Sequence, residues 1–113
     1  MDKSEAVKLA MMLPLTTGFV LKRKDIVEQV NRLYLSDVDK KSIRSLQNYM
    51  IQANCDEGLL DRVKRGYYKI TDDGFEWLRK VSLSINNDSK SNMLSDIAYL
   101  ELEIIHKKIV KDE

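Results

Sequence analysis

Residues 38–54, VDKKSIRSLQNYMIQAN, decide the predicted fold, because their pattern indicates a helix with two different faces. Apolar residues recur at steps of three or four, as on a helix face packed against a core: Ile43, Leu46, Met50 and Ala53. The other face carries side chains that can neutralise phosphate or hydrogen-bond to base edges: Lys40, Lys41, Arg44, Ser45, Asn48 and Gln52. We therefore predict a recognition helix for a DNA major groove. An amphipathic helix with a merely solvated polar face would have the same pattern, so the flanking sequence must decide between the two.

The length and composition of the chain narrow the class of protein. Its 113 residues fit one domain, with 43% hydrophobic and 33% charged residues, as in soluble globular proteins. No apolar run approaches the roughly 18 residues that a membrane span needs, and the N-terminus lacks the apolar core of a signal peptide. We expect a cytoplasmic protein that does not contact membranes.

The net charge is +1, but the charges are unevenly distributed. Residues 1–80 carry 15 Lys and Arg against 12 Asp and Glu, whereas residues 81–113 carry 4 against 6. Ten of the basic residues fall into three clusters: Lys22, Arg23 and Lys24; Lys40, Lys41 and Arg44; and Arg62, Lys64, Arg65 and Lys69. These clusters form one phosphate-binding surface only if the fold brings them together.

Two helices are predicted before residue 38. Asp2 and Glu5 have the spacing of a capping box, and Pro14 should end the helix that follows. Phe19 to Leu21 are expected to form a short strand. Asp25 can cap a second helix, whose apolar residues keep helical spacing: Ile26, Val27, Val30, Leu33 and Tyr34. After a short polar turn, Ser36, Asp37 or Asp39 can cap the recognition helix, which gives a helix-turn-helix arrangement.

Residues 58–71, GLLDRVKRGYYKIT, predict a β-hairpin directly after the recognition helix. Leu59 to Lys64 and Tyr67 to Thr71 are rich in Val, Ile, Leu and Tyr, and Gly66 supplies a permissive turn position. The basic side chains of Arg62, Lys64, Arg65 and Lys69 could grip phosphates beside the groove. Solvated hairpins are also commonly basic.

The order of these elements, closing with TDDGFEWL at residues 71–78, resembles the winged helix-turn-helix of bacterial and phage transcription regulators over residues 4–80. MLPL, the Lys-rich start of the second helix and KKSIRSLQ are similar to the DNA-binding part of WYL-domain regulators, with Arg44 one place earlier than in their S-x-R-T-I-x-R-x-L pattern. Thr71 to Leu78 is more similar to the post-wing helix of the MarR and PadR types. The resemblance implies a mainly α fold with a small β-hairpin (α+β).

Two further helices are predicted after the hairpin. Thr71 should cap a helix over residues 71–81 that packs Phe75, Leu78 and Val81 inward, with Trp77 in the core or marking a contact surface. We expect a DNA-binding domain over residues 1–85, a polar linker at 86–92 and a C-terminal helix at 93–113.

The C-terminal helix has two adjacent apolar stripes, which together exceed one packing contact. The first holds Met93, Ile97, Leu100 and Ile104, and the second holds Leu94, Ala98, Leu102, Ile105 and Ile109. We predict that these residues form a homodimer, in which Met93, Leu94, Ile97, Leu100, Ile104, Ile105 and Ile109 are the contacts. The alternative is a helix folded back across the first helix of its own chain.

Catalysis finds little support in the sequence. His106 is expected to be solvated, Asp56 and Glu57 should raise the pKa of Cys55, and one Cys with one His are too few for a Cys/His zinc site. We expect no enzyme, no cofactor, no metal and no small-molecule ligand. The predicted function is that of a dimeric transcription regulator, acting as a repressor, that binds an inverted repeat in double-stranded DNA. The alternative is a winged-helix module that assembles a protein complex without reading DNA.

Overall fold

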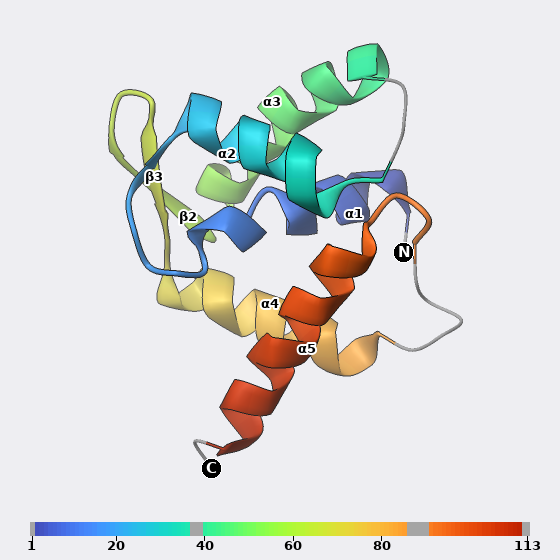
Figure 1. Cartoon of the computed structure of the whole chain (residues 1–113). Coiled ribbons are helices and arrows are strands. Elements are labelled where there is room, and N and C mark those ends of the chain that lie inside the picture. The colour runs from blue at the N-terminus through green and yellow to red at the C-terminus, as the bar shows by residue number, and fades with distance from the viewer. Residues whose placement is uncertain (1, 37–39, 86–90, 112–113) are drawn as a thin grey trace.

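The fold is mainly helical with a small three-stranded antiparallel sheet, so the predicted fold class is confirmed. The structure is a computed structural model that describes residues 2–36, 40–85 and 91–111, including their side chains except those of 40–42 and 108–111. In chain order the elements are α1 (Lys3–Ala10), the 3₁₀ turn η1 (Leu13–Leu15), β1 (Leu21–Lys22), α2 (Arg23–Gln29), the π-helical turn η2 (Val30–Tyr34), α3 (Lys40–Asp56), β2 (Leu60–Lys64), β3 (Tyr67–Ile70), α4 (Asp72–Ser84) and α5 (Asp96–Lys111) (Figure 1).

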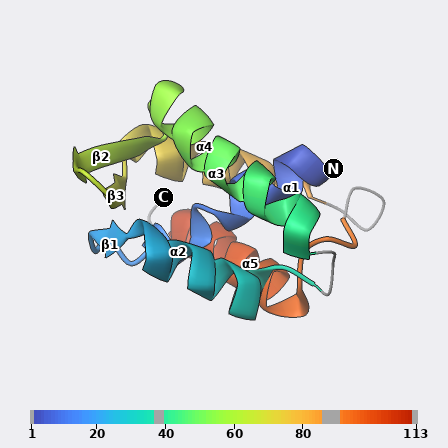
Figure 2. The same ribbon diagram turned by 90° about the horizontal axis from the view of Figure 1, so that it is seen from above.

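The helices form two sides around α1. In Figure 1, α2 and α3 lie at the top with the β2–β3 hairpin at one edge, whereas α4 and α5 lie below. Figure 2 looks down on α2 and α3 and places the hairpin beside the start of α2. Each of the five labelled helices contributes to the shared core, for example through Leu9, Ile26, Ile51, Leu78 and Leu102.

The first helix begins as predicted and ends earlier. The side chain of Asp2 accepts a hydrogen bond from the backbone N–H of Glu5 at 2.8 Å, so Asp2 caps α1. The helix ends at Ala10, because Met12 donates to the carbonyl of Leu9 three residues back and the chain tightens into η1. Pro14 lies inside that turn, so the helix does not extend to it.

The short strand and the second helix are displaced from their predicted positions. β1 is Leu21–Lys22, and Phe19 and Val20 are exposed residues of the preceding loop. α2 starts at Arg23, so Asp25 lies in its first turn and does not cap it. The backbone N–H of Arg23 donates to the carbonyl of Gly66 in the hairpin turn at 2.9 Å. A helix N-terminus leaves such donors unsatisfied, and here the hairpin satisfies one.

The predicted hairpin is confirmed and becomes part of a sheet with strand order β1-β3-β2. Across the sheet Lys22 pairs with Tyr67, and Tyr67 pairs with Lys64. The register of β2 shifts between Arg62 and Lys64. Gly66 has φ +80°, a left-handed conformation that favours glycine in this turn.

Helix α4 has the predicted N-cap, but the face that it turns toward the core differs from the predicted one. Thr71 Oγ1 accepts from the N–H of Gly74 at 3.0 Å, and the helix runs three residues past the predicted end, to Ser84. Leu78 is fully buried, but Phe75 is 37% exposed, so its predicted inward packing is wrong. Gly74 occupies the inward position because it lies against the carbonyl of Leu59 at the base of the hairpin.

Helix α5 begins at Asp96, not Met93, because Ser95 Oγ accepts from the N–H of Ala98 at 3.2 Å and caps the helix there. Leu94 forms a β-bridge with Leu35, and Ser95 N donates to the carbonyl of Tyr34 at 3.0 Å. The segment before α5 is therefore bound to the end of η2. Of the predicted linker, residues 86–90 lie outside the described residues, and Ser91 is hydrogen-bonded to the Tyr99 hydroxyl.

Of the residues predicted to cap α3, only Ser36 lies within the described part of the chain. Ser36 does not cap α3, because its N–H donates to the carbonyl of Met93 at 2.7 Å and its hydroxyl donates to the carbonyl of Asn92. Asp37 and Asp39 lie outside the described residues.

Candidate nucleic-acid interface

Helix α3 exposes the side chains that the sequence singled out. Arg44, Ser45, Asn48 and Gln52 are exposed, whereas the side chains of Lys40 and Lys41 lie outside the described residues. On the opposite side, Ile43 and Met50 are buried as predicted, and Leu46 and Ala53 are half-buried. Tyr49 was not predicted as a contact, yet it is 65% exposed. Its position four residues after Ser45, on the polar side, is the signal that could have identified it.

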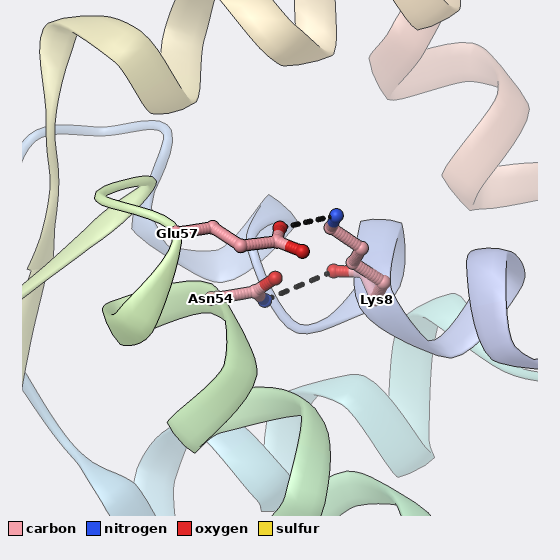
Figure 3. Close-up of polar contacts among 3 residues, drawn as sticks. All are labelled: Lys8, Asn54 and Glu57. Carbon is pink, nitrogen blue, oxygen red and sulfur yellow. Dashed lines mark hydrogen bonds and ion pairs between the residues drawn. The ribbon is translucent and has the colours of Figure 1, made fainter.

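Two buried amides, which the sequence did not single out, fix the orientation of α3. Gln47 is 1% exposed and donates from Nε2 to Asn31 Oδ1 at 2.7 Å, which joins α3 to η2. Asn54 is fully buried and donates from Nδ2 to the carbonyl of Lys8 in α1 at 3.4 Å (Figure 3). Asn54 Oδ1 has no hydrogen-bond partner. Because buried polar groups are costly to leave unpaired, the Gln47 contact favours one rotation of α3 over others.

The side chain of Lys8 contacts the C-terminal end of α3. Its Nζ lies 2.5 Å from Glu57 Oε2, just beyond the helix, and 4.9 Å from the centroid of the Trp77 ring (Figure 3 shows the Glu57 contact). The half-buried ring of Trp77 thus packs within the chain, where a lysine covers it. Together with Asn54, this contact holds the C-terminal end of α3 against α1.

The first and third basic clusters meet on the sheet. Lys22 and Lys64 lie on the two strands that flank Tyr67, with their Nζ atoms 5.8 and 4.3 Å from its ring centroid. The two ammonium groups therefore share one aromatic ring, although 42 positions separate them in sequence. Arg65 is exposed in the adjoining turn.

Arg23 connects the sheet to α3. Its backbone is held by the carbonyl of Gly66, and its guanidinium Nη2 donates to Asn48 Oδ1 in the middle of α3. Arg44 lies one helical turn before Asn48 on the exposed side. Members of all three predicted clusters are thereby brought to one region, at the start of α2, the tip of the hairpin and the exposed side of α3.

Of the other predicted cations, Lys69 has its charge offset by a carboxylate. Lys69 Nζ lies 4.0 Å from Asp61 Oδ2 across the hairpin, in an exposed ion pair of the kind that contributes little stability. Arg62 is exposed and pairs with Tyr68 in the strand register, and Lys24 is exposed in the first turn of α2.

The C-terminal end of α3 is acidic. Gln52 Nε2 donates to Asp56 Oδ1 at 2.9 Å, and both Asp56 and Glu57 are exposed. Since carboxylates repel phosphate, the part of α3 compatible with a nucleic-acid backbone ends before Gln52.

The structure divides the predicted dimer contacts. Leu94 and Ile105 are buried within the chain, together with Ala98 and Leu102, where α5 packs mainly on α4 and η2. Ile97, Leu100 and Ile104 are 44%, 58% and 58% exposed. Met93 is half-buried, and the side chain of Ile109 lies outside the described residues. One stripe therefore belongs to the core, and the other faces outward.

Cys55 and His106 differ in part from expectation. The pKa of Cys55 is raised, first by burial and then by Asp56 and Asp61, so the predicted direction is confirmed and Asp61 acts in place of Glu57. His106 is half-buried rather than solvated, and its Nδ1 is buried without a hydrogen-bond partner. It borders an open groove of about 790 Å³ between α4, residues 91–92 and α5, together with Ser82, Tyr99 and Glu103.

Among residues 2–36, 40–85 and 91–111, no group of three or more His, Cys, Asp or Glu side chains could hold a metal ion. Within the same ranges, no helix has the length and apolarity to span a membrane. Comparisons of the chain with protein families, with curated proteins and with solved structures return no match.

Proposed function

We propose that this protein is a dimeric, sequence-specific double-stranded DNA-binding regulator with a winged helix-turn-helix fold, acting in the cytoplasm without catalysis. The observation that carries the proposal is the double contact of Arg23, with the hairpin turn through its backbone and with Asn48 of α3 through its guanidinium. It brings cations from the start of α2 and from the hairpin beside the polar side of α3. The element order and the β1-β3-β2 strand order also favour a winged helix.

In the proposed complex, α3 enters the major groove and its exposed Arg44, Ser45 and Asn48 meet base edges. Lys22, Lys64 and Arg65 hold phosphates on the hairpin side. If a protomer neutralises about five phosphates, the slope of log K against log salt should be about −4 to −5 per protomer.

A salt-titrated binding measurement with full-length protein tests the proposal. Fluorescence anisotropy with labelled genomic and random duplexes should give a steep salt dependence, with tighter binding to some genomic fragments. Lys64→Ala should weaken binding to all duplexes and flatten the slope by about 1 unit. Arg44→Ala should cost about 1 to 3 kcal/mol on the preferred sequence only. Salt-independent binding would refute the proposed function, whereas equal effects of both variants on preferred and random DNA would refute base reading by α3.

The dimer would use the outward stripe of α5. Figure 1 places α5 on the side of α4, below α2 and α3, and the view from above shows α5 beneath α2 (Figure 2). A two-fold axis next to α5, on the side away from α3, can leave the α3 helices of both copies facing the same duplex. Asp96, Glu101 and Glu103 lie in the first half of α5, and Lys107 is exposed near the end of its described side chains. An antiparallel pair would therefore place opposite charges against each other. Two half-sites about 34 Å apart would form an inverted repeat.

The alternative, a protein-assembly module, would use the same apolar stripe with a different partner. It predicts no salt-dependent binding to duplex DNA, so the same titration distinguishes the two functions.

A further inference from the structure

The contact between Arg23 and Asn48 determines which hydrogen-bonding groups α3 offers to DNA. Asn48 has one acceptor oxygen and one NH₂ group with two donors, and a side-chain amide can be turned either way. Arg23 has donors only, because a guanidinium has no acceptor. The amide of Asn48 must therefore turn its oxygen toward Arg23, as in the structure, where Nη2 donates to Oδ1. The NH₂ group of Asn48 then faces away from Arg23 and is free for another partner, whereas the remaining lone pair of the oxygen lies beside the guanidinium.

The backbone of Arg23 holds the guanidinium in this place. Arg23 is the first residue of α2, and its N–H is bound to the carbonyl of Gly66 at 2.9 Å. Both side chains are exposed, so they are accessible to a ligand. Arg23 and Asn48 together thus present a cluster of donors, with a positive charge beside the one amide oxygen.

The base edges of the major groove respond differently to such a cluster. Guanine offers two acceptors, N7 and O6, whereas adenine offers the acceptor N7 beside the donor N6 amino group. A free asparagine suits adenine, because its oxygen accepts from N6 while its NH₂ donates to N7. Here the oxygen already accepts from a cation, and its second lone pair lies beside the guanidinium. The adenine amino group would have to approach that lone pair with its donors facing the donors and the positive charge of Arg23. Guanine can accept from both side chains.

We infer that Arg23 is a specificity-determining residue, which shifts the base preference of Asn48 from adenine to guanine. This base preference rests on the proposed DNA binding. It assigns to Arg23, which the sequence predicts only as a phosphate contact, a second role in positioning the Asn48 amide.

Selection from a randomised duplex library with purified full-length protein, followed by sequencing, tests the inference. The relevant position is the one at which Asn48→Ala abolishes the base preference. Wild type should prefer guanine over adenine there by about tenfold. Arg23→Ala frees the Asn48 oxygen and should shift the preference at that position to adenine. Arg23→Lys keeps a donor within reach of the oxygen and should retain guanine.

Lys24→Ala is the matched control, because it removes one exposed positive charge from the same helical turn. It should weaken binding as much as Arg23→Ala on random DNA and leave the guanine preference unchanged. Circular dichroism melts of each variant verify folding. A wild-type preference for adenine, or an Arg23→Ala profile indistinguishable from that of Lys24→Ala, overturns the inference while leaving DNA binding intact. Absence of salt-dependent duplex binding by the wild type overturns the proposed function as well.

Discussion

Gly74→Ala tests the close approach between α4 and the base of the hairpin. A Cβ at position 74 would lie 2.2 Å from the carbonyl oxygen of Leu59 and 2.7 Å from Ile70 Cγ1. The carbonyl of Leu59 cannot easily retreat, because it accepts from the backbone N–H of Thr71 at 3.1 Å and lies 3.0 Å from the Thr71 hydroxyl. The substitution should therefore separate the helix from the hairpin.

The magnitude follows from the required displacement. Ordinary contact begins at 3.4 Å, so the carbonyl or the helix must move by 1.2 Å. Overpacking of this kind costs about 1 to 3 kcal/mol, and loss of the Thr71 N–H bond costs about 1 kcal/mol more. Alanine recovers up to about 1 kcal/mol through its higher helix propensity. The free energy of unfolding should fall by about 2 kcal/mol, which lowers the melting temperature by roughly 10 °C in a domain of about 100 residues.

Urea and thermal denaturation followed by circular dichroism measure this change. Lys80→Ala is the control, since Lys80 is exposed on the same helix and its replacement should alter the free energy of unfolding by less than about 0.5 kcal/mol. A Gly74→Ala protein as stable as wild type, or more stable, would show that α4 and the hairpin are not packed as closely as the structure places them.

Three other predictions concern the dimer and the titratable side chains. Leu100→Glu combined with Ile104→Glu should convert a dimer into a monomer at micromolar concentration, as measured by light scattering, because both side chains are exposed on the proposed dimer surface. Point substitutions are preferable to deletion of α5, which would expose its buried stripe. A monomeric wild type would contradict the prediction. Because burial, Asp56 and Asp61 raise the pKa of Cys55, its thiol should react with an aromatic disulfide at pH 7.5 more slowly than an unstructured cysteine peptide does, and equal rates would refute this. Burial also raises the pKa of Tyr99, so its neutral form contributes stability that is present below the usual pKa near 10 and is lost as the pH rises through the raised pKa. In urea denaturation, the free energy of unfolding should therefore fall less at high pH in Tyr99→Phe than in wild type. Equal losses of stability in the two proteins would count against this prediction.

Features that depend on neighbouring residues were predictable from the sequence. Asp2 caps α1 and Thr71 caps α4 through N–H groups three residues ahead, and the hairpin turns at Gly66. The spacing of apolar residues in α3 predicted that Arg44 and Asn48 are exposed. These features are local, because capping, turn geometry and helical period are set within a few positions of the chain.

Features that depend on distant segments were not predictable. The apolar spacing of α4 placed Phe75 inward, whereas the carbonyl of Leu59 admits only Gly74 there. The two stripes of α5 were equivalent in the sequence, and contacts with α4 and η2 selected Leu94, Ala98, Leu102 and Ile105 as the buried one. Helical spacing places Gln47 on the face of Ile43 and Met50, but only the tertiary structure provides the Asn31 side chain that pairs with this buried amide.

The sequence by itself determined the α+β class, the amphipathic α3, the basic hairpin and the existence of three basic clusters. Only the tertiary structure decided which cations meet. Pairing of β1 with β3 brings Lys22 to Tyr67, and the same pairing holds Arg23 at the hairpin turn, from where its guanidinium reaches Asn48. The physical reason is that periodicity fixes the face on which a residue lies, whereas the distance between two faces depends on strand pairing and core packing between segments far apart in the chain.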